Sequence, residues 1–373
     1  MHWPANLCSS LIVSFVVLSP WALRAQAPSE LRLHSRVRAL PHTLQGPFVR
    51  NEDGSIVAVS QADAWTSRDN GRNWEKRPLF SPEKPAAQPI MVRDECALLR
   101  TRRGVIIASF MNDREKVWTW KNDLKDAPGA VLPTYAMRSL DGGQTWQDVQ
   151  KLHDDWTGAV RDMIQTKEGR VVIAAQKMLH NPGRHATITY WSDDDGMTWH
   201  ASNTIDLGGQ GHHAGNMEPT LVELQDGRVW MLLRTNWSEF WSAWSYDGGR
   251  NWRVLQPSGI AASSAPAIVK RLASGRLALV WNPLYPEGQT SYKLSGGDGI
   301  WSEVPVSNHR EELALAFSSD EGRTWSPPVV LARQPGKWLS YPYLFESAPG
   351  HLWLTTMQGG LRVEFDEADF VSQ

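Results

Sequence analysis

The stretch "SDDDGMTW", residues 192–199, decides the fold because its pattern recurs along the chain. The pattern S-x-D-x-G-x-[TN]-W begins at Ser67, Ser139, Ser192, Ser245 and Ser318. The Asp can accept hydrogen bonds from backbone amides just downstream, the Gly supplies a positive φ, and the Trp packs against a sheet. Each copy therefore predicts a turn between two strands. The aspartates lack the ligand spacing of an EF-hand loop, and several equal copies favour architecture over a single calcium or catalytic site.

A second pattern precedes each of these Asp turns: an apolar strand, a turn with Gly, and another apolar strand, as in "TLVELQDGRVWMLLR", residues 220–234. The turn glycines are Gly54, Gly104, Gly169, Gly227, Gly275 and Gly350. The first five hairpins are followed by a third strand, the Asp turn and a fourth strand. Six such units predict an all-β, six-bladed β-propeller that occupies residues 30–373 as a single domain. The sixth unit ends after three strands, and "ELRLHSRVRAL", residues 30–40, is expected to supply the outer strand that closes the ring.

Composition narrows the function classes. Residues 1–25 have the apolar run and small-residue end of a signal peptide, which predicts a secreted or periplasmic protein. The run is too short to span a bilayer, and no later stretch spans one. A net charge of −2 without a basic run argues against nucleic-acid binding. Cys8 lies in the signal and leaves Cys96 alone, so we expect no disulfide, no metal site and no cofactor. The oligomeric state stays open.

The loops are predicted to sort onto two faces. In an up-and-down sheet the Gly turns and the Asp turns lie on one face, and the opposite face carries the remaining loops. Two of these are long, at residues 111–134 and 282–310, and an irregular face is where a site is expected. Six positions lie nine residues ahead of the turn glycines and should ring the mouth of the channel: Gln45, Glu95, Val160, Glu218, Pro266 and Tyr341.

Two arginines should join this ring. Arg234 ends the second strand of the hairpin that Glu218 begins, and Arg310 ends the second long loop. A glutamate, two arginines and a tyrosine at one mouth provide cations for a carboxylate and a base beside a phenol.

The chain resembles the sialidase (neuraminidase) family, whose Asp-boxes match the repeated turns. "MEPTLVELQDGRVWMLLR", residues 217–234, is similar to the strand pair that carries the glutamate and second arginine of that family. "NHREELALAFSSDEGRTW" resembles the segment of the third arginine, and "SYPYLFES" that of the nucleophilic tyrosine. The resemblance implies these roles for Glu218, Arg234, Arg310 and Tyr341.

The family's first arginine opens an inner strand in an Arg-Ile-Pro motif, and this chain departs from it. The matching place in unit one holds Gln45, and in unit two it holds Asp94 with Arg93 alongside. We therefore expect Arg93, Asp94 and Glu95 to contact substrate. The missing arginine leaves another acidic or neutral sugar open beside sialic acid.

The family's acid/base aspartate lies on a loop after the second strand of a unit. Unit one offers Asp63 there, and unit two offers Asp113, Asp123 and Asp126. The choice stays open at this point; Asp113 is taken as the catalytic candidate.

Three functions fit these residues. The first is an exo-acting glycoside hydrolase of sialidase type, acting on terminal sialic acid or another acidic sugar of a glycan. The second is a glycan lyase, in which a His or Tyr abstracts a proton beside a uronic carboxylate; His212 and His213 favour it, and His213 is a candidate substrate contact in either case. The third is a non-catalytic propeller that binds glycan or protein.

Overall fold

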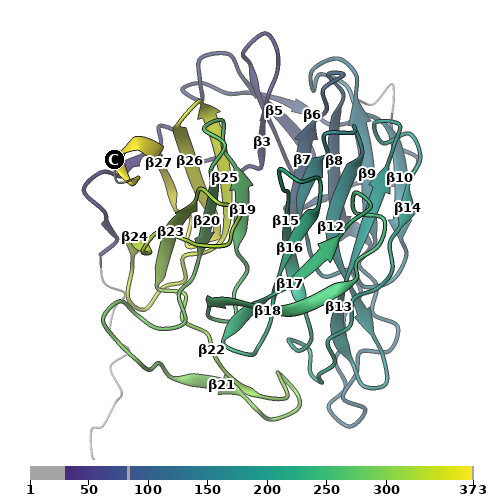
Figure 1. Cartoon of the computed structure of the whole chain (residues 1–373). Helices are drawn as coiled ribbons and strands as arrows, with labels where there is room; N and C mark the ends of the chain where they lie inside the picture. Colours follow the sequence, from purple (N-terminus) through teal and green to yellow (C-terminus); the bar gives the residue numbers. More distant parts are fainter. Residues whose placement is uncertain (1–29, 82–84, 372–373) are drawn as a thin grey trace, which may run out of the picture.

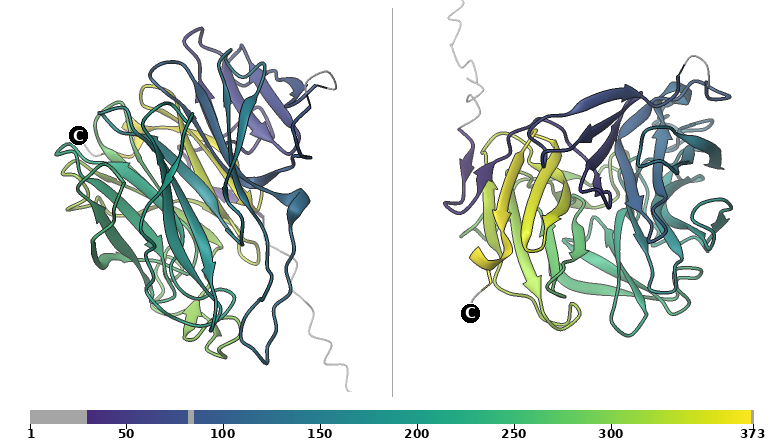
Figure 2. Two further views of the ribbon diagram at one scale, coloured as in Figure 1. Left: turned by 90° about the vertical axis from the view of Figure 1, so that its right-hand side faces the viewer. Right: turned by 90° about the horizontal axis from the view of Figure 1, so that it is seen from above.

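The computed structural model describes residues 30–81 and 85–371, in which six of the seven β-sheets surround a central axis as blades (Figures 1 and 2). In these residues the helical elements are the short 3₁₀ helices η1 (Asp113–Glu115) and η2 (Glu367–Asp369). The predicted all-β, six-bladed propeller is confirmed. The predicted signal peptide, residues 1–25, lies outside the described residues. No helix in the described part of the chain is long and apolar enough to cross a membrane.

The blades follow one another in chain order, each an antiparallel sheet built from the axis outward. Blade one has β3 (Phe48–Arg50), β4 (Ile56–Ser60), β5 (Asp63–Ser67) and β6 (Glu75–Pro78). Blade two has β7 (Val92–Arg100), β8 (Ile106–Asn112), β9 (Thr134–Ser139) and β10 (Gln147–His153). Blade three has β11 (Val160–Gln165), β12 (Val171–Leu179), β13 (Arg184–Ser192) and β14 (His200–Ala201).

The second half of the ring repeats this order. Blade four has β15 (Met217–Glu223), β16 (Val229–Arg234), β17 (Glu239–Ser245) and β18 (Val254–Ala261). Blade five has β19 (Ile268–Arg271), β20 (Leu277–Trp281), β23 (Glu312–Ser318) and β24 (Val329–Arg333). Blade six has β25 (Ser340–Ala348), β26 (His351–Gln358) and β27 (Arg362–Asp366). The hairpin of β21 (Leu294–Gly296) and β22 (Pro305–Ser307) lies within the second long loop.

The two ends of the chain close the ring together. Strand β2 (Arg38–Ala39) pairs with β27, with Arg38 opposite Glu364, and so supplies the predicted outer strand of blade six. The expected single strand over residues 30–40 is interrupted by a tight turn, in which the Val37 amide donates to the His34 carbonyl at 2.9 Å. The residues before this turn form a separate strand, β1 (Arg32–Leu33), which adds to the outer edge of blade five beside β24. The sequence did not predict that second pairing.

Apolar side chains fill the seams between neighbouring blades. The seam between blades six and one is aromatic, with the ring centres of Phe48 and Trp353 5.5 Å apart and Phe345 beside them. Cys96 has a free thiol, and burial raises its pKa to about 12. The ring is therefore held by burial of apolar surface, the main favourable contribution to folding.

The repeated motif forms the predicted turn between the third and fourth strands of its blade. In blade three, the carboxylate of Asp194 accepts a bond from the Thr198 amide at 2.8 Å and from the Thr198 hydroxyl at 2.6 Å. The Ser192 hydroxyl donates to the same carboxylate at 2.7 Å. The aspartate thus closes the turn by satisfying its donors.

Contacts between turns confirm that the Gly turns and Asp turns share one face. Arg170, which follows the turn at Gly169, donates to the Asp193 carboxylate at 2.7 Å and to the Asp247 carbonyl at 2.8 Å. Those two residues belong to the Asp turns of blades three and four. The two long loops and the candidate site therefore lie on the opposite face.

We predict that the Asp turns act on stability alone. Asp194→Ala should lower the free energy of unfolding by about 1–3 kcal/mol, because its donors lose a charged acceptor. Chemical denaturation measures this, and the kcat of the folded fraction should be unchanged. Met197→Ala, a change of an exposed side chain in the same turn, is the matched control and should shift stability by less than about 0.5 kcal/mol. A large fall in kcat with unchanged melting would contradict the structural role.

Candidate active site

Tyr341 of blade six and Glu218 of blade four meet at the mouth of the channel. The Tyr341 hydroxyl donates to Glu218 Oε1 at 2.7 Å. Both residues have left-handed backbone, with φ of 64° and 44°. The pairing of β15 with β16 shifts between Met217 and Thr220, and the Glu218 amide donates to Gln176 Oε1 of blade three at 2.9 Å. Strained backbone of this kind costs on the order of 1–3 kcal/mol per residue and gathers at functional sites, where it aims side chains.

Arg234 holds the other oxygen of the glutamate. Its Nη1 donates to Glu218 Oε2 at 2.6 Å, and its Nε and Nη2 donate to the Ser264 hydroxyl at 3.1 and 3.0 Å. These bonds occupy three of the five N–H donors of a guanidinium. Ser264 in turn donates to Asn236 Oδ1 at 2.7 Å, and Asn236 Nδ2 donates to the His213 carbonyl at 2.6 Å. The Arg234 guanidinium is thus held by residues of blade four, of the loop before it and of the connection to blade five.

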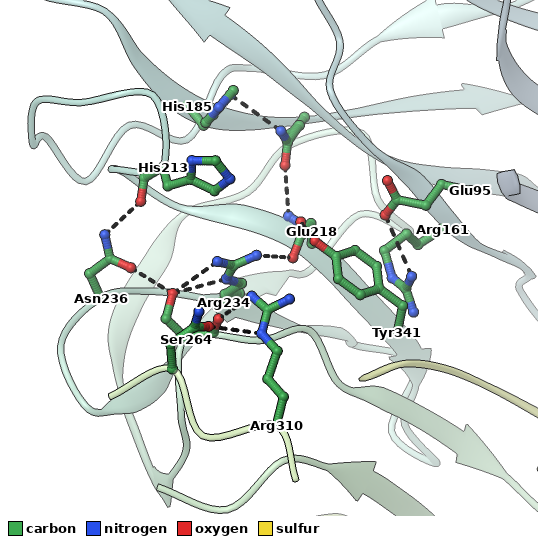
Figure 3. Close-up of polar contacts among 12 residues, drawn as sticks. Glu95, Arg161, His185, His213, Glu218, Arg234, Asn236, Ser264, Arg310 and Tyr341 are labelled. Carbon is green, nitrogen blue, oxygen red and sulfur yellow. Dashed lines mark hydrogen bonds and ion pairs between the residues drawn. The ribbon is translucent and has the colours of Figure 1, made fainter. Parts of the chain in front are cut away.

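Arg310 lies next to this pair, at the end of the second long loop. Its Nη2 donates to the Ser264 carbonyl at 2.7 Å, and its Nη1 donates to Gln358 Oε1 of blade six at 2.9 Å. Its guanidinium lies 4.8 Å from the ring centre of Trp338 and 5.5 Å from that of Tyr341. Figure 3 shows Glu218, Arg234 and Arg310 on one side of Tyr341, so the structure brings together the four residues predicted to form the centre of the site.

A third arginine, which the sequence did not predict, lies on the other side of Tyr341 (Figure 3). Arg161 of β11 has its guanidinium 5.0 Å from the ring centre of Tyr341 and 3.5 Å from Glu95 Oε1. Counting from the turn glycine gives Val160 for this place, but the pairing of β11 with β12 shifts between Val160 and Asp162. This β-bulge adds one residue and brings Arg161 into the site. The sequence signal that could have identified Arg161 is that an arginine directly follows Val160, the position found by counting.

Burial and neighbouring charges set the protonation states of Glu218 and Tyr341. Burial alone raises the pKa of Glu218, but the charge and hydrogen bond of Arg234, with Arg310 and Arg161, outweigh it and lower that pKa to about 2. Burial and the charge of Glu218 raise the pKa of Tyr341 to about 12. At neutral pH the site therefore holds a neutral phenol that donates to a carboxylate, with cations on both sides.

The remaining predicted site residues of blade two differ in burial and in their partners. Glu95 is buried beside Arg161. Arg93 and Asp113 are half exposed and bind each other, with Arg93 Nη1 donating to Asp113 Oδ1 at 2.7 Å. Asp94 is exposed, and its carbonyl accepts from Gln45 Nε2 at 2.8 Å. In the described residues no hydrogen bond links Asp113 or Arg93 to Tyr341 or Glu218, and their roles stay predictions.

Blade one lacks a loop on which an acid could reach the mouth. Strand β4 ends at Ser60 and β5 begins at Asp63, so the connection is a tight hairpin. Asp63 is paired with Lys76 of the neighbouring strand at 2.8 Å.

Each of the two long loops contributes a tryptophan that packs against a histidine of the segment before blade four. The ring of His213 stacks on Trp301 with centres 5.1 Å apart, and His212 meets Trp120 at 5.4 Å. Burial and the charge of Arg234 lower the pKa of His213 to about 3, so its imidazole is neutral. Its contribution to the Arg234 network comes from its backbone carbonyl, and substrate contact by its ring stays a prediction.

Comparisons with known proteins agree with this architecture. The family model described as "BNR repeat-like domain" matches residues 110–354. A sialidase from Micromonospora viridifaciens is 24% identical over 329 residues, which cover 83% of this chain and 47% of that protein. The chain therefore spans about half the length of this curated relative.

Solved structures resemble the fold at low identity. A protein of unknown function from Dyadobacter fermentans superposes with a TM-score of 0.59 at 18% identity, over 90% of this chain and 99% of that chain. A Hadza microbial sialidase superposes with a TM-score of 0.57, also at 18% identity, over 89% of this chain and 65% of that chain. At this identity the likeness concerns the fold.

Proposed function

The chain belongs to the family of BNR repeat-like domains and to the sialidase superfamily, and from this premise we propose that it is a glycoside hydrolase that removes sialic acid or another acidic sugar from glycan ends. The observation that carries the proposal is the 2.7 Å bond from the Tyr341 hydroxyl to Glu218, whose other oxygen is held by Arg234. Sialidases differ from the usual pair of carboxylates in using a tyrosine as nucleophile. The predicted signal at residues 1–25 would place the protein where glycan ends are exposed.

The charge of the site supports an anionic substrate. The site holds three positively charged side chains and two carboxyl groups, so the mouth attracts a negative group. The cations are Arg161, Arg234 and Arg310, and the carboxyl groups are those of Glu218 and Glu95. Arginine binds a carboxylate by parallel hydrogen bonds, and Arg234 and Arg310 meet at Ser264 on one side of Tyr341. A neutral phenol can approach an anionic sugar that would repel a carboxylate nucleophile, and Glu218 is placed to take the phenol proton as the bond to the sugar forms.

The test is a panel of aryl glycosides of sialic acid, of other acidic sugars and of neutral sugars, assayed with the purified protein. We expect the phenol to be released from an acidic glycoside and from none of the neutral ones. A product with the near-ultraviolet absorbance of an unsaturated sugar would identify a lyase and overturn the hydrolase. Saturable binding of the acidic glycosides without any turnover would identify a glycan-binding propeller.

A further inference from the structure

Glu95 occupies in blade two the place that Glu218 and Tyr341 occupy in blades four and six. Each of the three lies nine residues ahead of the turn glycine of its blade, at the start of the innermost strand. The pairing of β7 with β8 shifts between Val92 and Cys96, so a bulge turns this strand end as it does in blades three and four. Glu95 is therefore level with the catalytic pair and on the far side of Tyr341 from Arg310 (Figure 3).

Glu95 and Arg161 face each other, and both side chains have polar atoms without a hydrogen-bond partner. Their closest approach, from Arg161 Nη1 to Glu95 Oε1, is 3.5 Å, which is an ion pair and too long for a good hydrogen bond. Within the described residues, Glu95 Oε1 and the Nε and Nη1 atoms of Arg161 have no hydrogen-bond partner, although all are buried. Buried polar groups are almost always satisfied, so groups left open at the mouth point to a ligand.

We propose that Glu95 is the general acid that protonates the oxygen of the leaving group. The inference rests on the proposed function and adds the one group that its chemistry still requires. The tight hairpin of blade one leaves no loop for an acid there, and in blade two Asp113 is bound to Arg93 and Asp126 to His180. With the substrate carboxylate held by Arg234 and Arg310 on one side of Tyr341, the leaving group extends toward the other side, where Glu95 lies.

Two neighbouring carboxyl groups with opposite pKa shifts mark an acid and a base. Burial and the charge of Glu218 raise the pKa of Glu95 to about 7, although Arg161 opposes the shift. The pKa of Glu218 lies far below its usual value, so a proton bound by the pair resides on Glu95, which releases it as pH rises through about 7. The charged and titratable groups around Glu95 are Arg93 and Cys96 of its own strand, Arg161 of β11, Glu218 of β15, and Tyr341 and Tyr343 of β25.

The proton balance of the reaction is complete with these groups. In the first step the Tyr341 oxygen bonds to the anomeric carbon and its proton passes to Glu218. The glycosidic C–O bond breaks with its electron pair on the leaving oxygen, which takes the proton of Glu95. In the second step Glu95 takes a proton from water, the resulting hydroxide bonds to the anomeric carbon, and the bond to Tyr341 breaks. Tyr341 recovers its proton from Glu218, and one water has been consumed.

The test compares Glu95→Gln with the wild type on two glycosides of the same acidic sugar. With an ordinary sugar alcohol as leaving group, kcat/KM should fall by about 10²–10⁴-fold, since that oxygen needs the proton. With a nitrophenol as leaving group, kcat/KM should stay within a few-fold of wild type, since nitrophenolate leaves without protonation. The kcat of the variant on the nitrophenyl glycoside should fall, because Glu95 is also the base for water in the second step. Sodium azide should restore this kcat, because azide attacks the intermediate without a base.

The pH profile gives an independent readout. Glu95 acts when protonated, so the wild-type kcat/KM for the sugar-linked glycoside should fall as pH rises through about 7, and this fall should be absent from Glu95→Gln with the nitrophenyl glycoside. Glu52→Gln, the same change at an exposed glutamate on the Gly-turn face, controls for the substitution.

The outcomes separate the two proposals. Equal losses on both leaving groups, or the leaving-group pattern in Asp113→Asn instead of Glu95→Gln, would overturn the role of Glu95 and leave the hydrolase standing. A wild type that hydrolyses neither glycoside would overturn the hydrolase and the general acid together.

Discussion

Tyr341→Phe should leave a folded protein whose kcat is lower by on the order of 10²-fold or more, the scale of a lost catalytic group. The change removes the nucleophilic oxygen and keeps the ring against Arg161 and Arg310. Binding of an acidic sugar should persist, because the arginines are untouched. Glu218→Gln should lose a similar factor, and the double variant should be little worse than either single one, since the pair acts as a unit. Steady-state kinetics and calorimetry on the three variants measure these quantities.

A second tyrosine provides the matched control. The Tyr135 hydroxyl donates to Glu115 Oε1 at 2.6 Å, the same type of bond on the third strand of blade two. Tyr135→Phe should cost a comparable amount of stability and leave kcat unchanged. If Tyr341→Phe instead turns over substrate at nearly the wild-type rate, the tyrosine mechanism is excluded and the chemistry belongs to a carboxylate or a histidine.

Arg234→Met should lower the free energy of unfolding at neutral pH by about 3–5 kcal/mol, the cost of leaving a buried charge without its partner. The Arg234 side chain is fully buried, and its Nη1 is 2.6 Å from the Glu218 carboxylate. Adding Glu218→Gln to this variant removes the unpaired charge and should recover much of the loss. Denaturant melts of the two single variants and the double variant give the coupling energy directly.

The free energy of unfolding of the wild type and that of Arg234→Met should change with pH in opposite directions. In the wild type the folded pKa of Glu218 is lowered to about 2, below an unfolded value near 4.3, so the pair stabilises the fold above about pH 4 and this contribution is lost toward pH 2. In Arg234→Met the burial of Glu218 loses its main opposing charge, so acidification should reduce the penalty. Arg253→Met, at an exposed arginine of the same blade, controls for the loss of one positive charge. Parallel pH curves for wild type and Arg234→Met would contradict the buried pair.

The architecture could be predicted from the sequence because its information is local. An Asp turn such as that of Asp194 satisfies its own donors within a few residues, so the motif predicts a turn wherever it occurs. Glu218 and Arg234 could be placed on one hairpin by counting from Gly227, since antiparallel pairing fixes which residues lie opposite. Tyr341 followed from the same count in blade six.

The parts that the sequence did not predict depend on bulges and on contacts between blades. A bulge adds one residue without altering the hydrophobic pattern, so Val160 was counted where Arg161 lies. The contact of Arg161 with Glu95 joins blades three and two, and no periodicity encodes it. His213 could be assigned to the correct face, but its neutral, stacked ring depends on Trp301 from the distant second loop.

The pairing of β2 with β27 also sets an order of events in time. Its partners, Arg38 and Glu364, are nearly the whole chain apart, and such distant contacts form late because the connecting chain must first be ordered. Strand β2, one of the first described strands, must therefore wait for β27, the last one, before it can pair. Tyr341 stands on the blade that this pairing completes, and its partner Glu218 stands on blade four. We therefore expect the proposed nucleophile to meet its base only once blade six is complete, so that a chain cut before β27 lacks turnover.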